Sequence, residues 1–245
     1  MTKKYSYILA ITGASGAIYG LSLLKALIEH SYFVHLIVSE PGFTVMKEEL
    51  DIFKGGYNYK DKAKISNNVN PEISNFDAKQ EILNAIKLNL TFNSNIASDA
   101  AFNSYFEMFE LLDEKFLESK IASGSAKEVK GMAVVPCSMG SLARIACGIS
   151  GNLIERAADV VLKEKKRLVV CPRETPLNDI HLKNMLSLYS SGAVILPLIP
   201  GFYNKPKTIT DIVDFMTGRI LDSLCIDNDI YVRWKGYYNG KYDEK

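Results

Sequence analysis

The chain has 245 residues, 47% of them apolar, and its 29 basic residues balance 28 acidic ones to a formal net charge of +1. This size fits one large α/β domain or two small ones, with a substantial core. The near-zero charge excludes a strong overall attraction to nucleic acid or to an acidic membrane. No apolar stretch is long enough to span a membrane, and the first twelve residues do not form a signal peptide. We therefore expect a cytoplasmic protein with no nucleic-acid partner and no membrane span.

Four cysteines, at positions 137, 147, 171 and 225, form no CxxC pair, and the three histidines show no metal-ligand spacing. All four cysteines fall in apolar or helical stretches, so the sequence predicts buried, reduced thiols. Such thiols suit a reducing cytosol. No metal site is expected.

The first 50 residues predict a strand, a helix, a second strand and a second helix. The strands are expected over residues 5–11 and 33–38, and the helices over 17–29 and 41–50. In the first helix, apolar residues recur at the spacing of one helix face. A short crossover of this kind places the two strands parallel.

Residues 52–120 differ in composition, with many Asn, Lys and Ser residues. Helices are predicted over residues 78–90 and 102–117. The segment carries no repeat and no recognisable catalytic motif. We interpret it as an elaborated insertion within a single domain that covers residues 1–245.

A regular alternation of strands and helices returns after residue 131. Strands are expected over residues 132–135, 168–171 and 193–196, and helices over 138–147, 153–165, 180–189 and 208–224. Short buried strands alternating with helices predict an α/β fold with a doubly wound parallel sheet. The polar and aromatic tail beyond residue 227 is expected to pack on a neighbour or to fray.

Polar residues follow the predicted strands, at the edge where doubly wound sheets bind ligands. The first turn, TGASGA, holds Gly13 and Gly16, which permit tight turning, and its helix-start N–H groups favour a phosphate. An ordinary turn with a serine cap explains this pattern equally well. The same two interpretations apply to the turn from Ser138 to Ser141. Ser39 ends the second strand where a dinucleotide site would have an acidic residue, which leaves room for a mononucleotide.

Several charged residues could serve a site at this edge. Arg173 and Glu174 directly follow a buried strand, where a charged pair costs solvation unless it is paired or functional. Arg156 and Lys163 lie seven residues apart, so one helix face carries both, either toward an anion or toward solvent.

Glu49 at the end of the second helix, Tyr203 in a turn and Arg219 on the last helix have the same two interpretations. Each could contribute to a site or lie at the surface.

Taken together and in order, several motifs resemble those of the UbiX-type flavin prenyltransferases. They are TGASGAIYG at 12–20, ASGS at 122–125, CSMGSLARIACGISGNLIERAADVVLKE at 137–164, PRETPLNDIHLKNM at 172–185 and GAVILPLIPGFYNKP at 192–206. The resemblance covers residues 5–50 and 121–234. It implies a flavoprotein-type, Rossmann-like three-layer sandwich that assembles as a homododecamer with active sites between subunits.

The resemblance also implies the substrates and the residues that hold them. The acceptor would be reduced FMN and the donor dimethylallyl phosphate, and the prenylated FMN would pass to a UbiD-type decarboxylase. The flavin-binding residues carried over by motif are Gly13, Ala14, Ser15, Ser39, Ser138, Met139, Gly140, Ser141 and Arg173. Those implied for the donor are Arg156, Lys163, Tyr203 and Arg219.

The resemblance assigns the reaction to Ser15, Glu49, Lys163 and Glu174. Positive side chains and a proton donor stabilise the phosphate that leaves when the allylic C–O bond breaks, so this chemistry can run without a metal ion. We expect Glu174, with Ser15, to manage the proton at the leaving phosphate. Glu49 would orient the flavin or serve the second bond-forming step, and the two glutamate roles could be exchanged.

Two other functions remain open. A related flavin-dependent cysteine decarboxylase would carry a histidine on the first helix and a PASANT-like motif, and residues 17–29 hold no histidine. A non-enzymatic FMN carrier would explain the flavin turns but not the set of Lys163, Glu174, Tyr203 and Arg219.

Overall fold

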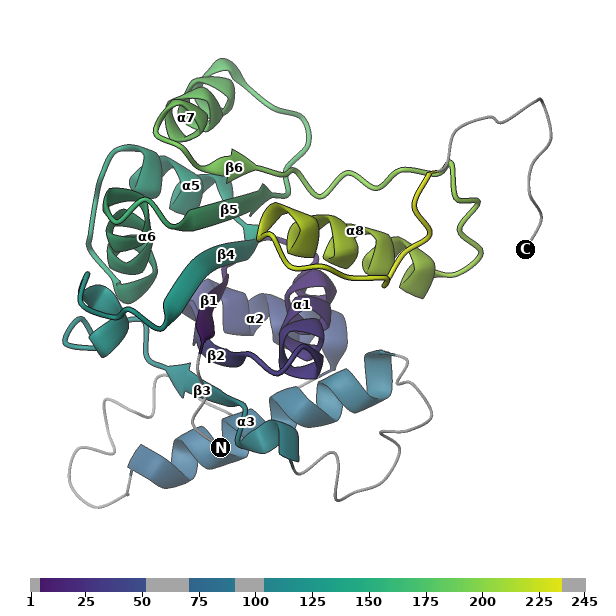
Figure 1. Ribbon diagram of the computed structural model, residues 1–245, viewed down its shortest axis with the longest axis horizontal. Coiled ribbons are helices and arrows are strands. Elements are labelled where there is room, and N and C mark those ends of the chain that lie inside the picture. The colour runs from purple at the N-terminus through teal and green to yellow at the C-terminus, as the bar shows by residue number, and fades with distance from the viewer. Residues whose placement is uncertain (1–4, 52–70, 91–103, 235–245) are drawn as a thin grey trace.

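The computed structural model describes residues 5–51, 71–90 and 104–234. Within them, six parallel strands form one sheet in the order β3-β2-β1-β4-β5-β6 (Figure 1). The strands are β1 (Ser6–Ile11), β2 (Phe33–Val38), β3 (Phe109–Leu112), β4 (Val129–Cys137), β5 (Arg167–Pro172) and β6 (Val194–Ile195). The strand order reverses between β1 and β4, and sheets of this kind bind ligands at that reversal.

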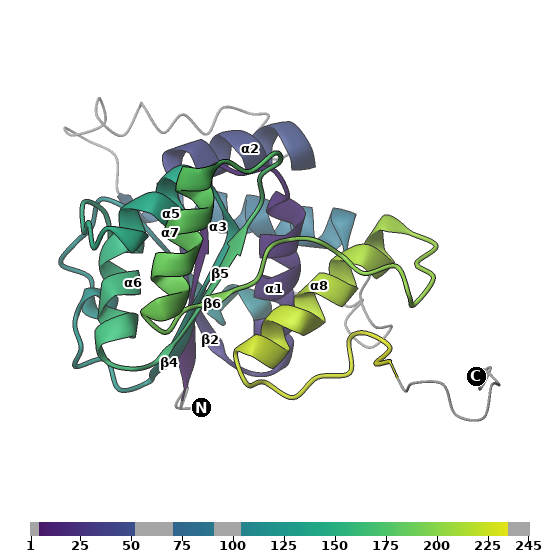
Figure 2. The same cartoon turned by 90° about the horizontal axis from the view of Figure 1, so that it is seen from above.

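Helices cover both faces of the sheet and make a three-layer sandwich (Figures 1 and 2). One face carries α1 (Ala17–Glu29), α3 (Pro71–Asn89) and α8 (Ile209–Ser223), and the other carries α5 (Met139–Ala146), α6 (Leu153–Lys163) and α7 (Asp179–Ser190). The helix α2 (Glu40–Leu50) crosses the end of the sheet at which α1 begins (Figure 2). The predicted α/β fold with a doubly wound parallel sheet is confirmed.

The strands are continuous apolar runs because helices cover both sheet faces. All six residues of β1 are buried. Leu9 and Ile11 pack toward α1 and α8, whereas Ile8 and Ala10 pack toward α5 and α6. This alternation follows from the two-residue period of a strand, and it divides the core into one cluster on each side of the sheet.

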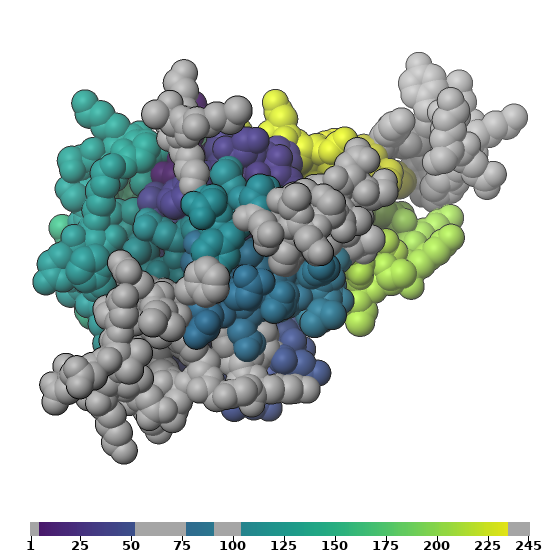
Figure 3. Space-filling model, turned by 90° about the horizontal axis from the view of Figure 1, so that it is seen from below, coloured from purple at the N-terminus to yellow at the C-terminus, as the bar shows by residue number. Residues whose placement is uncertain are grey.

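Most predicted elements lie within one to three residues of their observed bounds. The first helix and the second strand have the bounds that were predicted, residues 17–29 and 33–38. The helix predicted over 78–90 is α3, which begins earlier, at Pro71. Figure 3 shows residues of α3, coloured blue, at the surface of the molecule. Among the described residues, no helix is long and apolar enough to cross a membrane.

Of the helix predicted over residues 102–117, residues 104–106 are helical and the part from residue 107 on is wrong. Residues 109–112 form β3, an edge strand that pairs parallel with β2. Its burial alternates with the period of a strand, because Phe109 and Leu111 enter the core while Glu110 bonds to His35 on the other sheet face. A four-residue strand is too short for its period to be told from that of a helix. The segment predicted as an insertion thus contributes a strand to the sheet.

The tail was expected to pack on a neighbour or to fray, and its described part, up to residue 234, packs on α8 of its own chain. Asn228, Tyr231 and Arg233 all bond to Asp222 of α8. The segment therefore folds back along the helix of its own chain.

The prediction that all four cysteines are buried is half wrong. The thiols of Cys137 and Cys171 lie at the ends of β4 and β5 and are buried, whereas Cys147 and Cys225 are exposed. The exposed pair follows the last turns of α5 and α8, where an apolar stretch in the sequence ends at the surface. All four are free thiols.

Candidate active site

The turns that follow β1 and β4 are joined through one buried side chain, Thr12. Its hydroxyl donates to the carbonyl oxygen of Pro136 at 3.0 Å and accepts from the N–H of Ser138 at 2.8 Å. Thr12 is fully buried, so these bonds are shielded from water. From the sequence, Thr12 was only the first residue of the TGASGA turn, because its bonding partners lie more than 120 residues away.

The two glycines of the first turn are needed for different reasons. A Cβ built on Gly13 would overlap the Cβ of Pro41 in α2, so only glycine lets the turn and the helix approach this closely. Gly16 has a φ of 103°, a conformation that L side chains rarely adopt. The turn is therefore fixed both by α2 and by its own backbone.

The carboxylate of Glu49 caps the start of α1. It accepts from the backbone N–H of Gly16 at 2.9 and 3.1 Å and from that of Ala17 at 2.9 Å. The first N–H groups of a helix have no partner within the helix and carry partial positive charge, so they favour an anion. Gly16 has no side chain to cap them. Glu49, predicted to be catalytic, thus lies at the β1–α1 turn.

Serines cap the helices that begin at this edge. Ser39 accepts from the N–H of Gly42 at the start of α2, and Ser138 accepts from the N–H of Ser141 at the start of α5. Ser138 also donates to the hydroxyl of Ser141 at 3.1 Å. The capping interpretation is therefore confirmed for the turn from Ser138 to Ser141 but is wrong for the first turn, where Glu49 caps the helix and no serine does.

Arg173 ties the β5 end to the first turn. Its Nε donates to the carbonyl oxygen of Ser15 at 3.1 Å, and its N–H donates to that of Cys137. Glu174 is exposed and accepts from the N–H of Thr175 at 3.0 Å. Arg173 thus bonds across the sheet edge and not to the glutamate beside it.

The structure brings the predicted flavin-binding residues to one edge of the sheet, on both sides of the strand reversal. These are Gly13, Ala14, Ser15, Ser39, Ser138, Met139, Gly140, Ser141 and Arg173. Glu49 joins them from α2. Within the described ranges, no group of three or more His, Cys, Asp or Glu side chains is arranged to hold a metal ion.

An ion pair between a buried glutamate and a half-exposed arginine supports the second turn, and the sequence did not reveal it. Glu155 in the first turn of α6 is 2% exposed, bonds to Nε of Arg144, and accepts from the N–H of Gly151 at 2.8 Å. Arg144 in turn donates to the hydroxyl of Ser141 at 3.3 Å. A lone charge in an amphipathic helix is typical of a solvated face, and only the buried position distinguishes Glu155.

The four predicted donor-binding residues do not meet within one chain. Arg156 and Lys163 lie on α6, where they pair with Asp159 at 3.1 Å and Glu164 at 3.1 Å. Tyr203 and Arg219 belong to α8 and the loop before it, on the opposite face of the sheet (Figure 1). The chain therefore presents two separate half-sets of donor residues.

Aromatic rings surround the half-set at α8. The ring of Tyr203 meets those of Phe215 and Trp234 edge to face, with centroids 5.7 and 5.8 Å apart. Phe215 also meets Tyr231, whose hydroxyl accepts from Arg219 at 3.5 Å. This hydrogen bond, together with the nearby Asp222 carboxylate, raises the pKa of Arg219 above its usual value, so the guanidinium stays charged.

Residues 1–221 match the family model described as Flavoprotein. The chain is 42% identical over 231 residues to the flavin prenyltransferase UbiX of Halalkalibacterium halodurans, with 94% of both chains covered. It belongs to the UbiX flavin prenyltransferase family. UbiX of Methanocaldococcus jannaschii is 40% identical over 227 residues, which cover 93% of this chain and 97% of that protein.

Solved structures of UbiX proteins share the fold. AnUbiX, solved with FMN and dimethylallyl pyrophosphate, is 33% identical with a TM-score of 0.71 over 96% of this chain and 100% of that one. A dodecameric FMN-dependent UbiX-like decarboxylase from Escherichia coli is 32% identical with a TM-score of 0.68, over 94% of this chain and all of that one. A PPC decarboxylase mutant is only 16% identical at a TM-score of 0.50, so that likeness concerns the fold alone.

Proposed function

We propose that this chain transfers a dimethylallyl group from dimethylallyl phosphate to reduced FMN. The product, prenylated FMN, would serve a UbiD-type decarboxylase in the cytoplasm. The observation that carries the proposal is the 42% identity to a flavin prenyltransferase across 94% of both chains. The gathering of the flavin set at the strand reversal supports it, because that edge is where such sheets bind nucleotides.

The turns after β1 and β4 fit an FMN. Ser15 is exposed, and the hydroxyls of Ser138 and Ser141 lie at the start of α5, where N–H groups favour a phosphate. Arg173 lies across the same edge and supplies a positive charge. When bound, the reduced flavin supplies the nucleophilic ring atoms. The residues of the chain would hold it, exclude water and neutralise the phosphate.

The donor half-sets would stabilise the leaving phosphate. Lys163, Arg156 and Arg219 carry positive charge and Tyr203 a hydroxyl, and such groups lower the barrier most where charge develops in the transition state. Glu174 with Ser15 would handle the proton at that phosphate, because Glu174 is exposed and its carboxylate already accepts a hydrogen bond from the N–H of Thr175 that holds it in place. Glu49 would orient the turn beneath the flavin.

We further propose that the site is completed by another copy of the chain. The half-set on α6 and the half-set at α8 lie on opposite faces of the sheet, so a complete donor site needs both faces from neighbouring subunits. A dodecamer of single-domain chains, like the E. coli relative, meets this need.

The proposal is tested by mixing the protein anaerobically with reduced FMN and dimethylallyl phosphate and measuring the mass of the flavin. A flavin heavier by one five-carbon unit is expected, and Glu174→Gln should bind flavin without forming it. Glu118→Gln, which changes an exposed glutamate outside the predicted site residues, is the matched control. Bound but unmodified FMN in the wild type would contradict the proposal and favour a carrier.

A further inference from the structure

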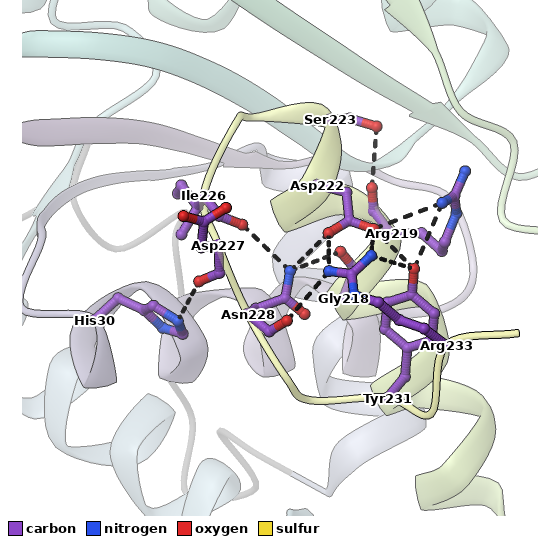
Figure 4. A network of polar contacts seen from close by, with 10 residues as sticks. All are labelled: His30, Gly218, Arg219, Asp222, Ser223, Ile226, Asp227, Asn228, Tyr231 and Arg233. Atoms are coloured by element: carbon purple, nitrogen blue, oxygen red, sulfur yellow. Dashed lines mark hydrogen bonds and ion pairs between the residues drawn. The ribbon is translucent and has the colours of Figure 1, made fainter. Parts of the chain in front are cut away.

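Asp222 on α8 is the centre of a polar network that joins the helix to the segment 226–234 (Figure 4). Its carboxylate accepts four hydrogen bonds. Oδ1 accepts from Asn228 Nδ2 at 2.9 Å and from Arg233 Nη2 at 2.6 Å. Oδ2 accepts from the Tyr231 hydroxyl at 2.8 Å and from Arg233 Nη1 at 3.0 Å. A carboxylate has about four lone-pair sites, so this one is saturated.

Arg219 lies one helical turn before Asp222, where residues three apart face each other. Its Nη1 is 3.5 Å from Asp222 Oδ2 and 3.5 Å from the Tyr231 hydroxyl. Both distances are at the limit of a hydrogen bond. Its side chain is 51% exposed. Arg219 is thus close to the Asp222 carboxylate but makes only a long contact with it.

Arg233 occupies the two carboxylate oxygens of Asp222 to which Arg219 would otherwise bind. It binds Asp222 with two parallel N–H groups, a geometry that is stronger than a single contact. It also donates to the carbonyl oxygen of Asn228 and to the Tyr231 hydroxyl, each at 3.1 Å. Burial alone would raise the pKa of Asp222, but the bonds from Arg233 and Tyr231 outweigh it and lower that pKa, so the carboxylate is ionised at neutral pH.

The geometry points to Arg233 as a positioning residue that keeps Arg219 available to the donor phosphate by saturating Asp222. This inference rests on the proposed function for the identity of the anion. Arg219, Arg233 and the Asp222 carboxylate together carry a net charge of one positive unit. Removal of Arg233 would cancel that charge, and it would free two lone-pair directions on Asp222 that Arg219 can reach within its own helix.

The test compares Arg233→Gln, Asp222→Asn and the double variant, each assembled and loaded with FMN. Arg233→Gln should raise the KM for dimethylallyl phosphate about fivefold, in line with a partly exposed ion pair, with kcat and FMN affinity within about twofold. The added Asp222→Asn should return the KM toward the wild-type value, because it removes the competing carboxylate. Lys183→Gln, which removes an exposed paired charge on α7, is the control and should change nothing.

A double variant as impaired as Arg233→Gln would overturn the inference, since Arg233 would then act as a plain structural anchor or as a direct phosphate ligand. A second cycle tests the dependence on Arg219 directly. If Arg233 acts through Arg219, then in an Arg219→Gln background the loss of Arg233 adds no further weakening of dimethylallyl phosphate binding measured by calorimetry. Additive weakening contradicts the inference.

A readout that needs no catalysis separates this inference from the proposed function. Phenylglyoxal modifies accessible guanidinium groups, and peptide masses identify the arginine modified. Modification of Arg219 should slow in Arg233→Gln and recover in the double variant. If the wild type forms no prenylated flavin, the proposed function fails while this result still decides the role of Arg233. An unchanged rate at Arg219 in Arg233→Gln would overturn that role.

Discussion

The carboxylate of Glu49 accepts a hydrogen bond of 2.9 Å from the backbone N–H of Gly16, 33 residues earlier in the chain. It thereby supplies the helix cap that a glycine cannot provide. We expect Glu49→Ala to lower the free energy of unfolding by about 1 kcal/mol, as the loss of an N-cap does. Glu49→Gln keeps an acceptor oxygen and should lose less. Urea unfolding at neutral pH measures both, and Glu48→Ala, at the exposed neighbouring position, should be neutral. Equal stability of Glu49→Ala and wild type would contradict the capping role.

Gly13→Ala should move the first turn away from α2. The new Cβ would overlap Pro41, and overpacking of this kind costs about 1–3 kcal/mol. FMN affinity should fall with stability, as fluorescence quenching on flavin binding would report. Gly140→Ala is the control for stability, because its Cβ would meet only Arg144 Nη1 at 3.5 Å, an ordinary contact. A Gly13→Ala variant with wild-type stability would mean that α2 can move away from the turn without lowering the free energy of unfolding.

Glu155→Ala should destabilise the fold near the second turn. It leaves the N–H of Gly151 without its acceptor, which costs about 1–3 kcal/mol for a buried donor, whereas Arg144 is half-exposed and can be solvated by water when it loses its carboxylate. FMN binding should weaken as well, because Arg144 bonds to Ser141 of the predicted flavin turn. Thermal unfolding and flavin titration measure the two effects. Loss of stability without any change in flavin affinity would separate Glu155 from the site.

Gly218→Ala should release the C-terminal segment from α8. A Cβ at this position would overlap the Tyr231 ring and lie 3.0 Å from Asn228 Oδ1. Because both residues bond to Asp222, we expect faster tryptic cleavage after Arg233 and a loss of about 1–3 kcal/mol in unfolding free energy. Mass mapping of timed digests measures the cleavage. An unchanged digestion rate would show that the segment does not depend on this contact.

Thiol reactivity should divide the four cysteines into two pairs. Burial raises the pKa of Cys137 to about 12, and it raises the pKa of Cys171 well above its usual value. A raised pKa depletes the thiolate, so at pH 8 only about one Cys137 in ten thousand is reactive even before access is considered. A disulfide reagent should therefore titrate Cys147 and Cys225 in the native protein and all four thiols in denaturant. Native labelling of Cys137 would contradict its burial.

Local patterns were sufficient to predict most of the fold. The helix 17–29 and the strand 33–38 were predicted with their observed bounds. The apolar spacing identifies both elements, Gly16 marks the start of the helix, and Ser39 marks the end of the strand. The edge strand β3 was missed since four residues give too little period and its partner β2 lies more than 70 residues away. Pairing with a distant strand, not local preference, decides its structure.

The motifs named candidate site residues, but the contacts between them could not be predicted from the sequence. The motifs indicated the flavin turns, and the carboxyl-end rule of parallel sheets explains why they meet. No local rule could link Glu49 to Gly16, Thr12 to Ser138 or Arg233 to Asp222, because each bond forms only after the intervening chain has folded. The separation of the donor half-sets was likewise invisible, since it depends on which sheet face each helix covers.

The helix α2 touches the first turn at both of its ends, through Pro41 against Gly13 and through Glu49 against Gly16. These two helical residues are eight positions apart, or about 12 Å along a rigid axis. A turn that one helix contacts at two points has little conformational freedom left before a ligand binds. The entropy of ordering this loop is therefore lost when the chain folds, and a ligand that binds there loses little affinity to further ordering.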